Sequence, residues 1–402
     1  MASTDTHAYD PQALRAWLRL QLTPGVSHVY GYRLLRTFGL PENVFVQNLS
    51  ALRTVVPDRQ AMALLQEPAE LNSSTDTLLQ WIARGDGTNR VITLGDSDYP
   101  ESLLHISDPP LMLYVQGSDV AWRELVRAPC MAIVGSRNPT AQGAENAAAF
   151  AFSLAQSGLS IVSGLALGID AAAHRGALRS QENALPTIAV VGTGLDRVYP
   201  AAHTGLATEI ATRGLVISEY PLGTPPLQAH FPRRNRLISG LSCATLVVEA
   251  AMRSGSLITA QQALEQGRDV FAIPGSIHST QAKGCHALIK QGAQLVDCIQ
   301  DILDATVFQK HVAVPAMNPN KTSEAFTSQT PSSATETHTL LLDALAFDPC
   351  SLESLQNRTG WDTARLQSQL MELELSGLIG RMPGGLFQRL QRNLFSASDH
   401  PS

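Results

Sequence analysis

Residues 131–143, MAIVGSRNPTAQG, join a short apolar run to a Gly-Ser-Arg-Asn-Pro turn and an Ala-rich stretch. The apolar run predicts a buried strand over 131–136, and the Ala-rich stretch predicts a helix over 140–157, with Asn138 as N-cap and Pro139 in the first turn. The turn would bring a helix N-terminus and the guanidinium of Arg137 to one point, which suits a phosphate. An ordinary strand–helix turn with a surface arginine accounts for the same residues.

The alternation of apolar runs and helical stretches continues along the chain. Further strands are predicted over 159–164, 187–194, 215–220, 245–250 and 270–275, with helices over 170–180, 202–213 and 256–266. Nearly continuous apolar strands are typical of a parallel sheet that is covered on both faces. We therefore expect an open, doubly wound α/β sheet, in which ligands bind beyond the carboxyl ends of the strands.

Small and basic residues follow several of these predicted strands. Gly164, Gly192 and Gly194 permit close approach of a ligand to the backbone. Residues 221–226 are rich in Pro and Gly, so 222–236 is expected to cross the sheet rim as an ordered excursion rather than a helix. That excursion would place its Phe and Arg side chains beside Arg137, and the Ser-Gly-Ser turn at 254–256 resembles a second anion cradle.

Asp170 and His174 lie four residues apart in the predicted helix 170–180, and therefore on one face of it. Such a pair suggests acid–base chemistry. A capping aspartate and a hydrogen-bonded histidine explain the two residues equally well.

The whole chain of 402 residues is acidic, with a formal net charge of −6, so any site for a polyanion must be local. Residues 131–290 hold ten Arg and two Lys against six Glu and three Asp, a local net charge of +3. The five cysteines show no C-x-x-C spacing, which favours reduced thiols without a metal site or disulfides. The polar N-terminus and the lack of a long apolar run predict a cytoplasmic protein outside the membrane.

Five stretches resemble one known family, the DNA-processing protein A family, also called DprA or Smf. They are MAIVGSRNPTAQG (131–143), SGLALGIDAAAHRGAL (163–178), TIAVVGTGLDRVYP (187–200), LVISEYPLGTPPLQAHFPRRNRLISGLS (215–242) and LVVEAAMRSGSLITAQQALEQGRDVFAIPG (246–275). The resemblance covers nearly all of residues 90–300. It implies an extended Rossmann domain that binds single-stranded DNA without sequence preference, forms a homodimer, protects incoming DNA and loads the RecA recombinase during natural transformation.

The resemblance also implies residue roles. The DNA contacts are expected at Ser136, Arg137, Gly164, Gly192, Gly194, Phe231, Arg234, Asn235 and Arg236. The dimer face is expected within 284–295, at His286, Ile289 and Leu295, and the recombinase-facing surface at Gln261 and Leu264. No cofactor, no metal and no enzymatic activity are expected.

The domain organisation follows from composition and from the longer members of the family. We expect an N-terminal helical domain over 1–89, the extended Rossmann domain over 90–308, a flexible Ser/Thr/Pro/Asn-rich linker over 309–337, a winged-helix-like domain over 338–391 and a tail over 392–402. The N-terminal domain resembles SAM and helix-hairpin-helix units. Because Ser27 stands where that hairpin wants its second glycine, the domain is expected to pack rather than bind DNA.

The C-terminal unit is expected to hold three helices and a hairpin. Ser351 and Asp362 suit N-caps of its second and third helices, and three leucines line one face of the third. The unit has a net charge of −2, and its third helix carries Glu372 and Glu374. Duplex binding depends mainly on phosphate contacts, so we expect a protein-interaction or regulatory module instead.

Two other functions remain open. One is a nucleotide-binding enzyme related to nucleoside-5′-monophosphate phosphoribohydrolases, whose signature is a PGGxGTxxE loop; SGSLITAQQAL at 254–264 lacks the double glycine and the carboxylate. The other is a regulator that senses a mononucleotide in the same pocket. The chain has no G-x-x-x-x-G-K-[ST] motif and no evident carboxylate cluster for a metal pair.

Overall fold

The computed structural model describes residues 10–305, 338, 340–342, 344–345, 349–382 and 385–389. As predicted, the N-terminal part is helical: α1 (Pro11–Leu22), α2 (His28–Phe38), α3 (Pro41–Phe45), α4 (Leu49–Arg53), α5 (Asp58–Leu64) and α6 (Leu71–Arg84). Leu18, Leu34 and Leu78 of these helices share one core with Tyr114 from the neighbouring sheet. The helices are therefore built onto the sheet and do not form a separate core.

The middle of the chain forms a nine-stranded sheet. Its strands are β1 (Asn89–Thr93), β2 (Met112–Gly117), β3 (Cys130–Val134), β4 (Ser160–Ser163), β5 (Thr187–Val191), β6 (Leu215–Ser218), β7 (Ala244–Val247), β8 (Asp269–Ala272) and β9 (Gln294–Leu295). The order is β1-β2-β6-β5-β4-β3-β7-β8-β9. Strands β3 to β9 run parallel, and β2 pairs antiparallel with both β1 and β6. The six predicted strands and the doubly wound, Rossmann-like sheet are confirmed.

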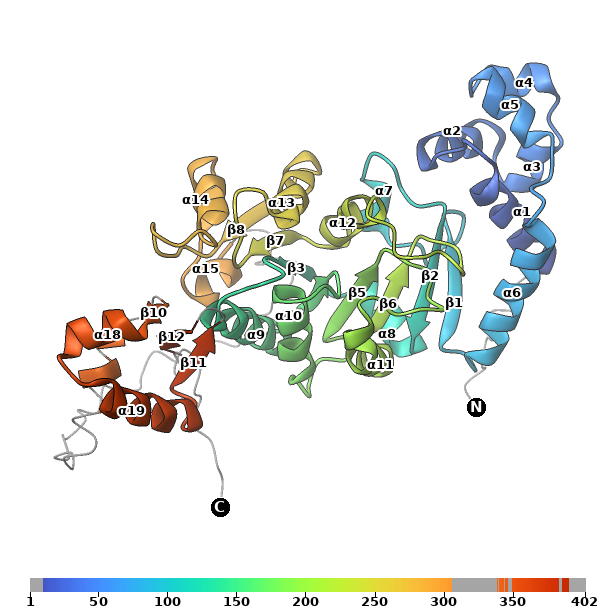
Figure 1. The fold of residues 1–402 in the computed structure, drawn as a ribbon. Coiled ribbons are helices and arrows are strands. Elements are labelled where there is room, and N and C mark those ends of the chain that lie inside the picture. Colours follow the sequence, from blue (N-terminus) through green and yellow to red (C-terminus); the bar gives the residue numbers. More distant parts are fainter. Residues whose placement is uncertain are drawn as a thin grey trace, which may run out of the picture.

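Helices cover both faces of this sheet (Figure 1). They are α7 (Glu101–Leu104), α8 (Asp119–Leu125), α9 (Ala141–Gln156), α10 (Ile169–Leu178), α11 (Thr204–Arg213), α12 (His230–Leu241), α13 (Gly255–Glu265), α14 (Lys283–Lys290) and α15 (Ile299–Leu303), with a 3₁₀ turn, η1 (Ala201–His203). One face packs against α7, α8, α12, α13 and α14, and the other against α9, α10, α11 and α15. Burial on both faces explains why the parallel strands are almost wholly apolar.

The expectation that residues 222–236 form an excursion without a helix is wrong for its second half. Residues 230–241 form α12, whose buried face includes Leu237 and Leu241. The Pro and Gly residues that suggested a loop stop at 226, and Pro232 lies in the first turn of the helix, where its missing N–H costs little.

A buried carboxylate joins the N-terminal helices to the sheet. Glu219 follows β6, is 2% exposed, and accepts two hydrogen bonds from Arg236 of α12, at 3.0 and 2.7 Å. His28, the first residue of α2, lies 2.9 Å from the same carboxylate. Burial alone would raise the pKa of Glu219, but Arg236 and His28 hold it at about 2. A charged Glu219 thus links β6, α12 and α2.

The described C-terminal residues form β10 (Cys350–Ser351), α18 (Leu352–Thr359), α19 (Thr363–Leu375), β11 (Ile379–Met382) and β12 (Leu386–Arg389). The strands make an antiparallel sheet in the order β10-β12-β11, the arrangement of a winged helix. Ser351 and Asp362 cap α18 and α19 as predicted, and Leu366, Leu370 and Leu373 are buried on one face of α19. The first helix expected here and the linker expected over 309–337 lie wholly or partly outside the described residues.

Two hydrogen bonds attach this unit to the large sheet domain. The backbone N–H of Ala141 points to the sulfur of Met382 at 3.1 Å, and that of Gln142 donates to Gln388 at 3.2 Å. The strands of the C-terminal hairpin therefore contact the first turn of α9. Among the described helices, none is long and apolar enough to cross a membrane.

We expect Arg236→Ala to lower the free energy of unfolding by about 3–5 kcal/mol, because it leaves the buried charge of Glu219 without its main partner. Chemical denaturation measures the change. The matched control is Arg233→Ala, since Arg233 is exposed three residues earlier in the same helix and should change stability by no more than about 0.5 kcal/mol. Equal effects of the two substitutions would contradict the structural role of Arg236.

Candidate functional site

A cavity of about 660 Å³ lies at the carboxyl ends of β3 and β7. The chain proceeds from β3 through β4 and β5 to β6 in one direction, and β7 then pairs on the other side of β3. The cavity therefore occupies the point where the strand order reverses, which is where open α/β sheets bind ligands. The loops after β3 and β7 and the first turns of α12 and α13 line it.

One wall of this cavity carries a cation and two aromatic rings. The guanidinium carbon of Arg137 lies 5.7 Å from the centroid of the Phe231 ring, and that ring lies 5.5 Å from the ring of Tyr199. Arg137 is exposed and forms no ion pair with a described residue, while Tyr199 is 49% exposed. This wall offers flat surfaces for stacking and a free positive charge.

The start of α13 also lines the cavity. Ser254 caps this helix by accepting from the N–H of Ser256, and exposed Arg253 precedes it. Arg253 and Tyr199 both line the cavity, and neither was among the expected site residues. The sequence could have indicated both residues, because Tyr199 follows the predicted strand 187–194 and Arg253 adjoins the predicted Ser-Gly-Ser turn at 254–256.

The expected phosphate site at the N-terminus of α9 is wrong. The helix begins at Ala141 with Thr140 as its N-cap, two residues later than expected. The carboxylate of Glu249 accepts from the N–H of Thr140 at 2.9 Å and from its hydroxyl at 2.6 Å. A protein anion therefore already occupies this helix end. Ser136 is buried, and its hydroxyl accepts from the N–H of Asn138 at 3.1 Å.

Arg234 lines the cavity floor but is 4% exposed. Its guanidinium donates to the carbonyl of Gly164 at 2.7 Å and to that of Val190. Burial lowers the pKa of Arg234 to about 10, partly offset by the nearby carboxylate of Asp170. Arg234 thus holds two strand ends together beneath the site. Asn235, the next residue, is half-buried and lines the same cavity.

Four of the expected contacts are placed differently from the prediction. Arg236 forms an ion pair with Glu219 and also donates to Asp108 at 2.8 Å. Its guanidinium group therefore does not lie beside that of Arg137 at the cavity, as the prediction required. A Cβ on Gly164 would lie 2.6 Å from the guanidinium of Arg234, so this glycine makes room for that side chain and not for a ligand. The remaining two, Gly192 and Gly194, are buried beneath Phe231 and the 221–222 segment respectively.

The acid–base alternative for Asp170 and His174 finds no support in the geometry. Asp170 accepts from the N–H groups of Gly164 and Ala166 at 3.1 and 3.3 Å. His174 is fully buried and shares a 2.7 Å hydrogen bond with the hydroxyl of Thr187. Burial lowers the pKa of His174 to about 3, so the ring is neutral. Both side chains therefore have a structural role.

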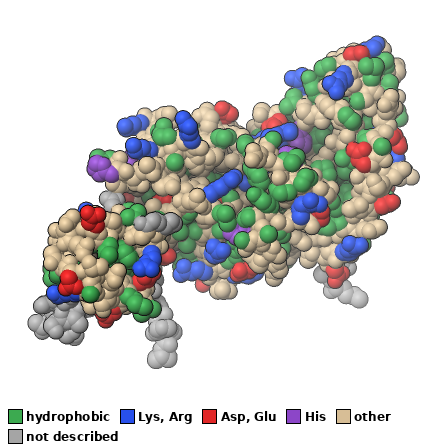
Figure 2. Space-filling view, in the orientation of Figure 1, with side chains coloured by type: hydrophobic (Ala, Val, Ile, Leu, Met, Phe, Trp, Pro, Cys, Tyr) green, Lys and Arg blue, Asp and Glu red, His purple; other side chains and the backbone are tan. Residues whose placement is uncertain are grey.

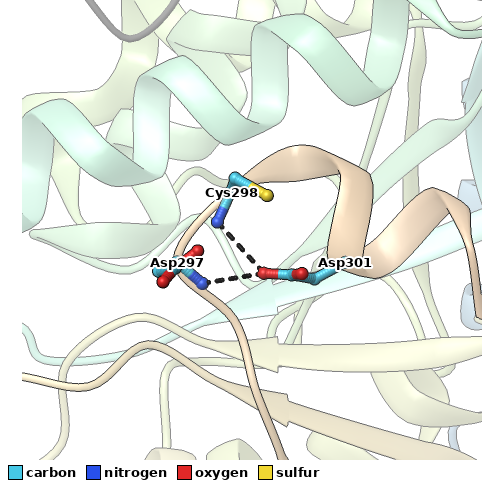
Figure 3. A group of neighbouring side chains, drawn as sticks. All are labelled: Asp297, Cys298 and Asp301. Carbon is cyan, nitrogen blue, oxygen red and sulfur yellow. Dashed lines mark hydrogen bonds between the residues drawn. The ribbon is translucent and has the colours of Figure 1, made fainter.

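Asp297, Cys298 and Asp301 are the one group of side chains in the described residues close enough together to hold a metal ion (Figure 3). The carboxylate of Asp301 accepts from the N–H groups of Asp297 and Cys298 at 3.1 and 3.2 Å, which caps α15. Those backbone donors lower the pKa of Asp301. Helix capping explains the arrangement.

The expected dimer and partner residues lie at one end of the sheet. Leu295 is 46% exposed on the edge strand β9, whereas Ile289 is partly buried against the core and His286 contacts the backbone of Gly275. Leu288, which lies within the same expected segment 284–295, is buried. Gln261 is exposed and Leu264 is 46% exposed, both on α13.

Charge on the visible face agrees with a local site. In Figure 2, Lys and Arg side chains are dispersed among acidic and uncharged ones. Arg137 and Arg253, which line the cavity, are both exposed.

Comparisons with known proteins agree with this fold. Residues 90–307 match the family described as DNA recombination-mediator protein A, and residues 325–385 match the DprA winged helix domain. Protein Smf of Escherichia coli is 38% identical over 379 residues, covering 94% of this chain and 96% of that protein. DNA processing protein DprA of Streptococcus pneumoniae is 50% identical over 208 residues, covering 52% and 71%. An X-ray structure of DprA from that species has a TM-score of 0.61 at 38% identity, covering 72% of this chain and 96% of the other.

We expect Gly164→Ala to destabilise the protein by about 1–3 kcal/mol, because the new methyl group would displace the guanidinium of Arg234. The matched control is Gly205→Ala in α11, where nothing lies within 4 Å of the added Cβ. That change should be neutral or stabilise by up to about 1 kcal/mol. Thermal unfolding of both variants measures the difference, and equal melting temperatures would contradict the assignment.

Proposed function

We propose, since this chain belongs to the DNA recombination-mediator protein A family, also called DprA or Smf, that its cavity binds single-stranded DNA during recombination. The observation that carries the proposal is the wall formed by Arg137, Phe231 and Tyr199, in a cavity that Arg253 also lines. In this acidic chain, free guanidinium groups and aromatic rings lie together at one cavity.

Each part of the site suits one part of a DNA strand. The rings of Phe231 and Tyr199 can stack on bases, and guanidinium groups make charge-assisted contacts with phosphates. Every base has a face that stacks, so such a site favours binding without sequence preference. A folded duplex hides those faces, which favours the single strand as ligand.

A nucleotide-processing enzyme is less well supported by the same geometry. Asp170 is the acidic residue among those that line the cavity, and its carboxylate accepts from two backbone N–H groups beside Arg234. Because two backbone N–H groups already donate to this carboxylate, it has a structural role and is poorly placed to accept a proton from a substrate, so binding is the function we propose.

The family resemblance supports three further parts of the proposal. The protein forms a homodimer through α14 and β9, where Leu295 exposes an apolar side chain on the sheet edge. It loads the RecA recombinase, which contacts Gln261 and Leu264 on α13, and it acts in the cytoplasm on incoming DNA. The winged-helix unit serves as a protein-interaction module, because Glu372 and Glu374 on α19 oppose a duplex backbone.

We expect Arg137→Ala to weaken binding of oligothymidylate and to reduce the log–log salt slope by roughly 0.7, the value for one lost phosphate contact with a single strand. Phe231→Ala should cost about 1–3 kcal/mol with little change in slope, because stacking carries no charge. Fluorescence anisotropy at several salt concentrations measures both quantities.

The matched control for this pair is Arg179→Ala. The Arg179 guanidinium lies 4.9 Å from the ring of Phe152, the same kind of contact, on α10 and away from the cavity. It should leave affinity and slope unchanged. Wild-type affinity in both Arg137→Ala and Phe231→Ala would rule out this cavity as the binding site.

We expect Leu295→Glu to convert the dimer to a monomer, because it places a charge on an apolar edge that would be covered. Light scattering after gel filtration measures the mass. Leu264→Glu is the control with matched exposure, 46% for both side chains, and should leave the dimer intact while weakening recombinase loading. A monomeric wild type would overturn the dimer proposal.

A further inference from the structure

Helix α2 lies on the same rim of the sheet as the cavity. Its first residue, His28, contacts Glu219 directly after the carboxyl end of β6. Gly31 of α2 packs against Leu111, which precedes β2 on the same side because β2 runs antiparallel to β6. Figure 1 shows α2 on the side of the sheet where α7 and α12 also lie.

The segment that contains α2 is locally basic. Residues 11–41 hold four arginines and no acidic residue, in a chain whose net charge is −6. Arg15 and Arg19 are paired with Glu67, which lies between α5 and α6. Arg33 and Arg36 are exposed, and neither makes an ion pair with a described residue. Two free guanidinium groups therefore face solvent on one side of α2.

Each of these two arginines lies over a tyrosine ring. The guanidinium carbon of Arg33 is 6.0 Å from the ring of Tyr30, and that of Arg36 is 5.9 Å from the ring of Tyr32. Both rings are half-buried, so part of each remains available. The cavity shows the same pairing in Arg137 and Phe231, at 5.7 Å.

Further aromatic and basic side chains lie on the rim between the cavity and α2. The rings of Tyr220 and His230 are stacked with centroids 4.1 Å apart, and Arg233 is exposed beside them. The cavity at β3 and the contact of α2 at β6 are three strands apart in the sheet, about 14 Å at the usual strand spacing. A strand that enters the cavity must therefore be several nucleotides long to reach α2.

We propose that the exposed face of α2, with Arg33, Arg36, Tyr30 and Tyr32, is a second contact surface for the same DNA strand that enters the cavity. The proposal rests on the proposed function and extends it along the rim. The N-terminal helices then bind DNA as well as pack, contrary to the expectation from Ser27. That residue has a φ of −75° and caps α2, so the helical face makes the contact without a hairpin glycine.

The test compares a short oligothymidylate of about three nucleotides, which is meant to occupy the cavity alone, with a long one of about twenty, so that only the long one spans both surfaces. The double variant Arg33→Ala/Arg36→Ala should bind the short oligonucleotide like the wild type. It should bind the long one roughly five- to tenfold more weakly, with the salt slope reduced by roughly 1.4 for two lost phosphate contacts.

Two further double variants complete the design. Arg84→Ala/Arg127→Ala removes two exposed arginines near the opposite, amino edge of the sheet and should change neither oligonucleotide's affinity. Arg33→Lys/Arg36→Lys keeps the charge and should retain most of the affinity for the long strand, which separates charge from packing. Circular dichroism melting confirms that all variants fold.

The possible results distinguish a failure of the second contact surface from a failure of the proposed function on which it rests. If the wild type fails to bind the short oligonucleotide, the proposed function itself fails. If the short one binds but Arg33→Ala/Arg36→Ala matches the Arg84→Ala/Arg127→Ala control on the long one, the second surface is wrong and the cavity stands alone.

Discussion

A single buried carboxylate determines how the main parts of this protein meet. Glu219 is 2% exposed, and a charge so far from water is tolerated only if partners neutralise it. Arg236 of α12 does so, and His28 of α2 contacts the same carboxylate, which fixes both helices at the carboxyl end of β6. Phe231 and Asn235 precede Arg236 on the same helix, so the ion pair also positions the cavity wall. The site depends on a contact that no ligand touches.

The arginines of the sheet domain divide into two groups with different tasks. Arg213, Arg234 and Arg268 donate to backbone carbonyls at the ends of helices and strands, where hydrogen bonds of the regular structure run out. Arg137 and Arg253 remain free at the cavity. Some arginines of the sheet domain thus stabilise the fold, while these two remain available at the cavity.

The strand–helix alternation predicted the sheet, its six central strands and the position of the site at the strand ends, because apolar periodicity is a local property. It did not predict which arginine of the 233–236 cluster is free. Residues two apart on a helix point to opposite sides, so Arg234 and Arg236 turn to different partners once 230–241 is helical. The cap of α9 also escaped prediction, since Glu249 is 109 residues from Thr140. Contacts between residues so distant in sequence depend on the finished fold.

The hairpin of the winged-helix unit supplies acceptors to the first turn of α9, through Met382 and Gln388. Two equilibria are therefore linked: the folding of that turn and the attachment of the C-terminal unit. Linkage is reciprocal, so a change that loosens the turn weakens the attachment by the same free energy, and the reverse holds as well. The segment that precedes this turn is the loop of Arg137, so the attachment of the C-terminal unit is linked to the cavity through the first turn of α9.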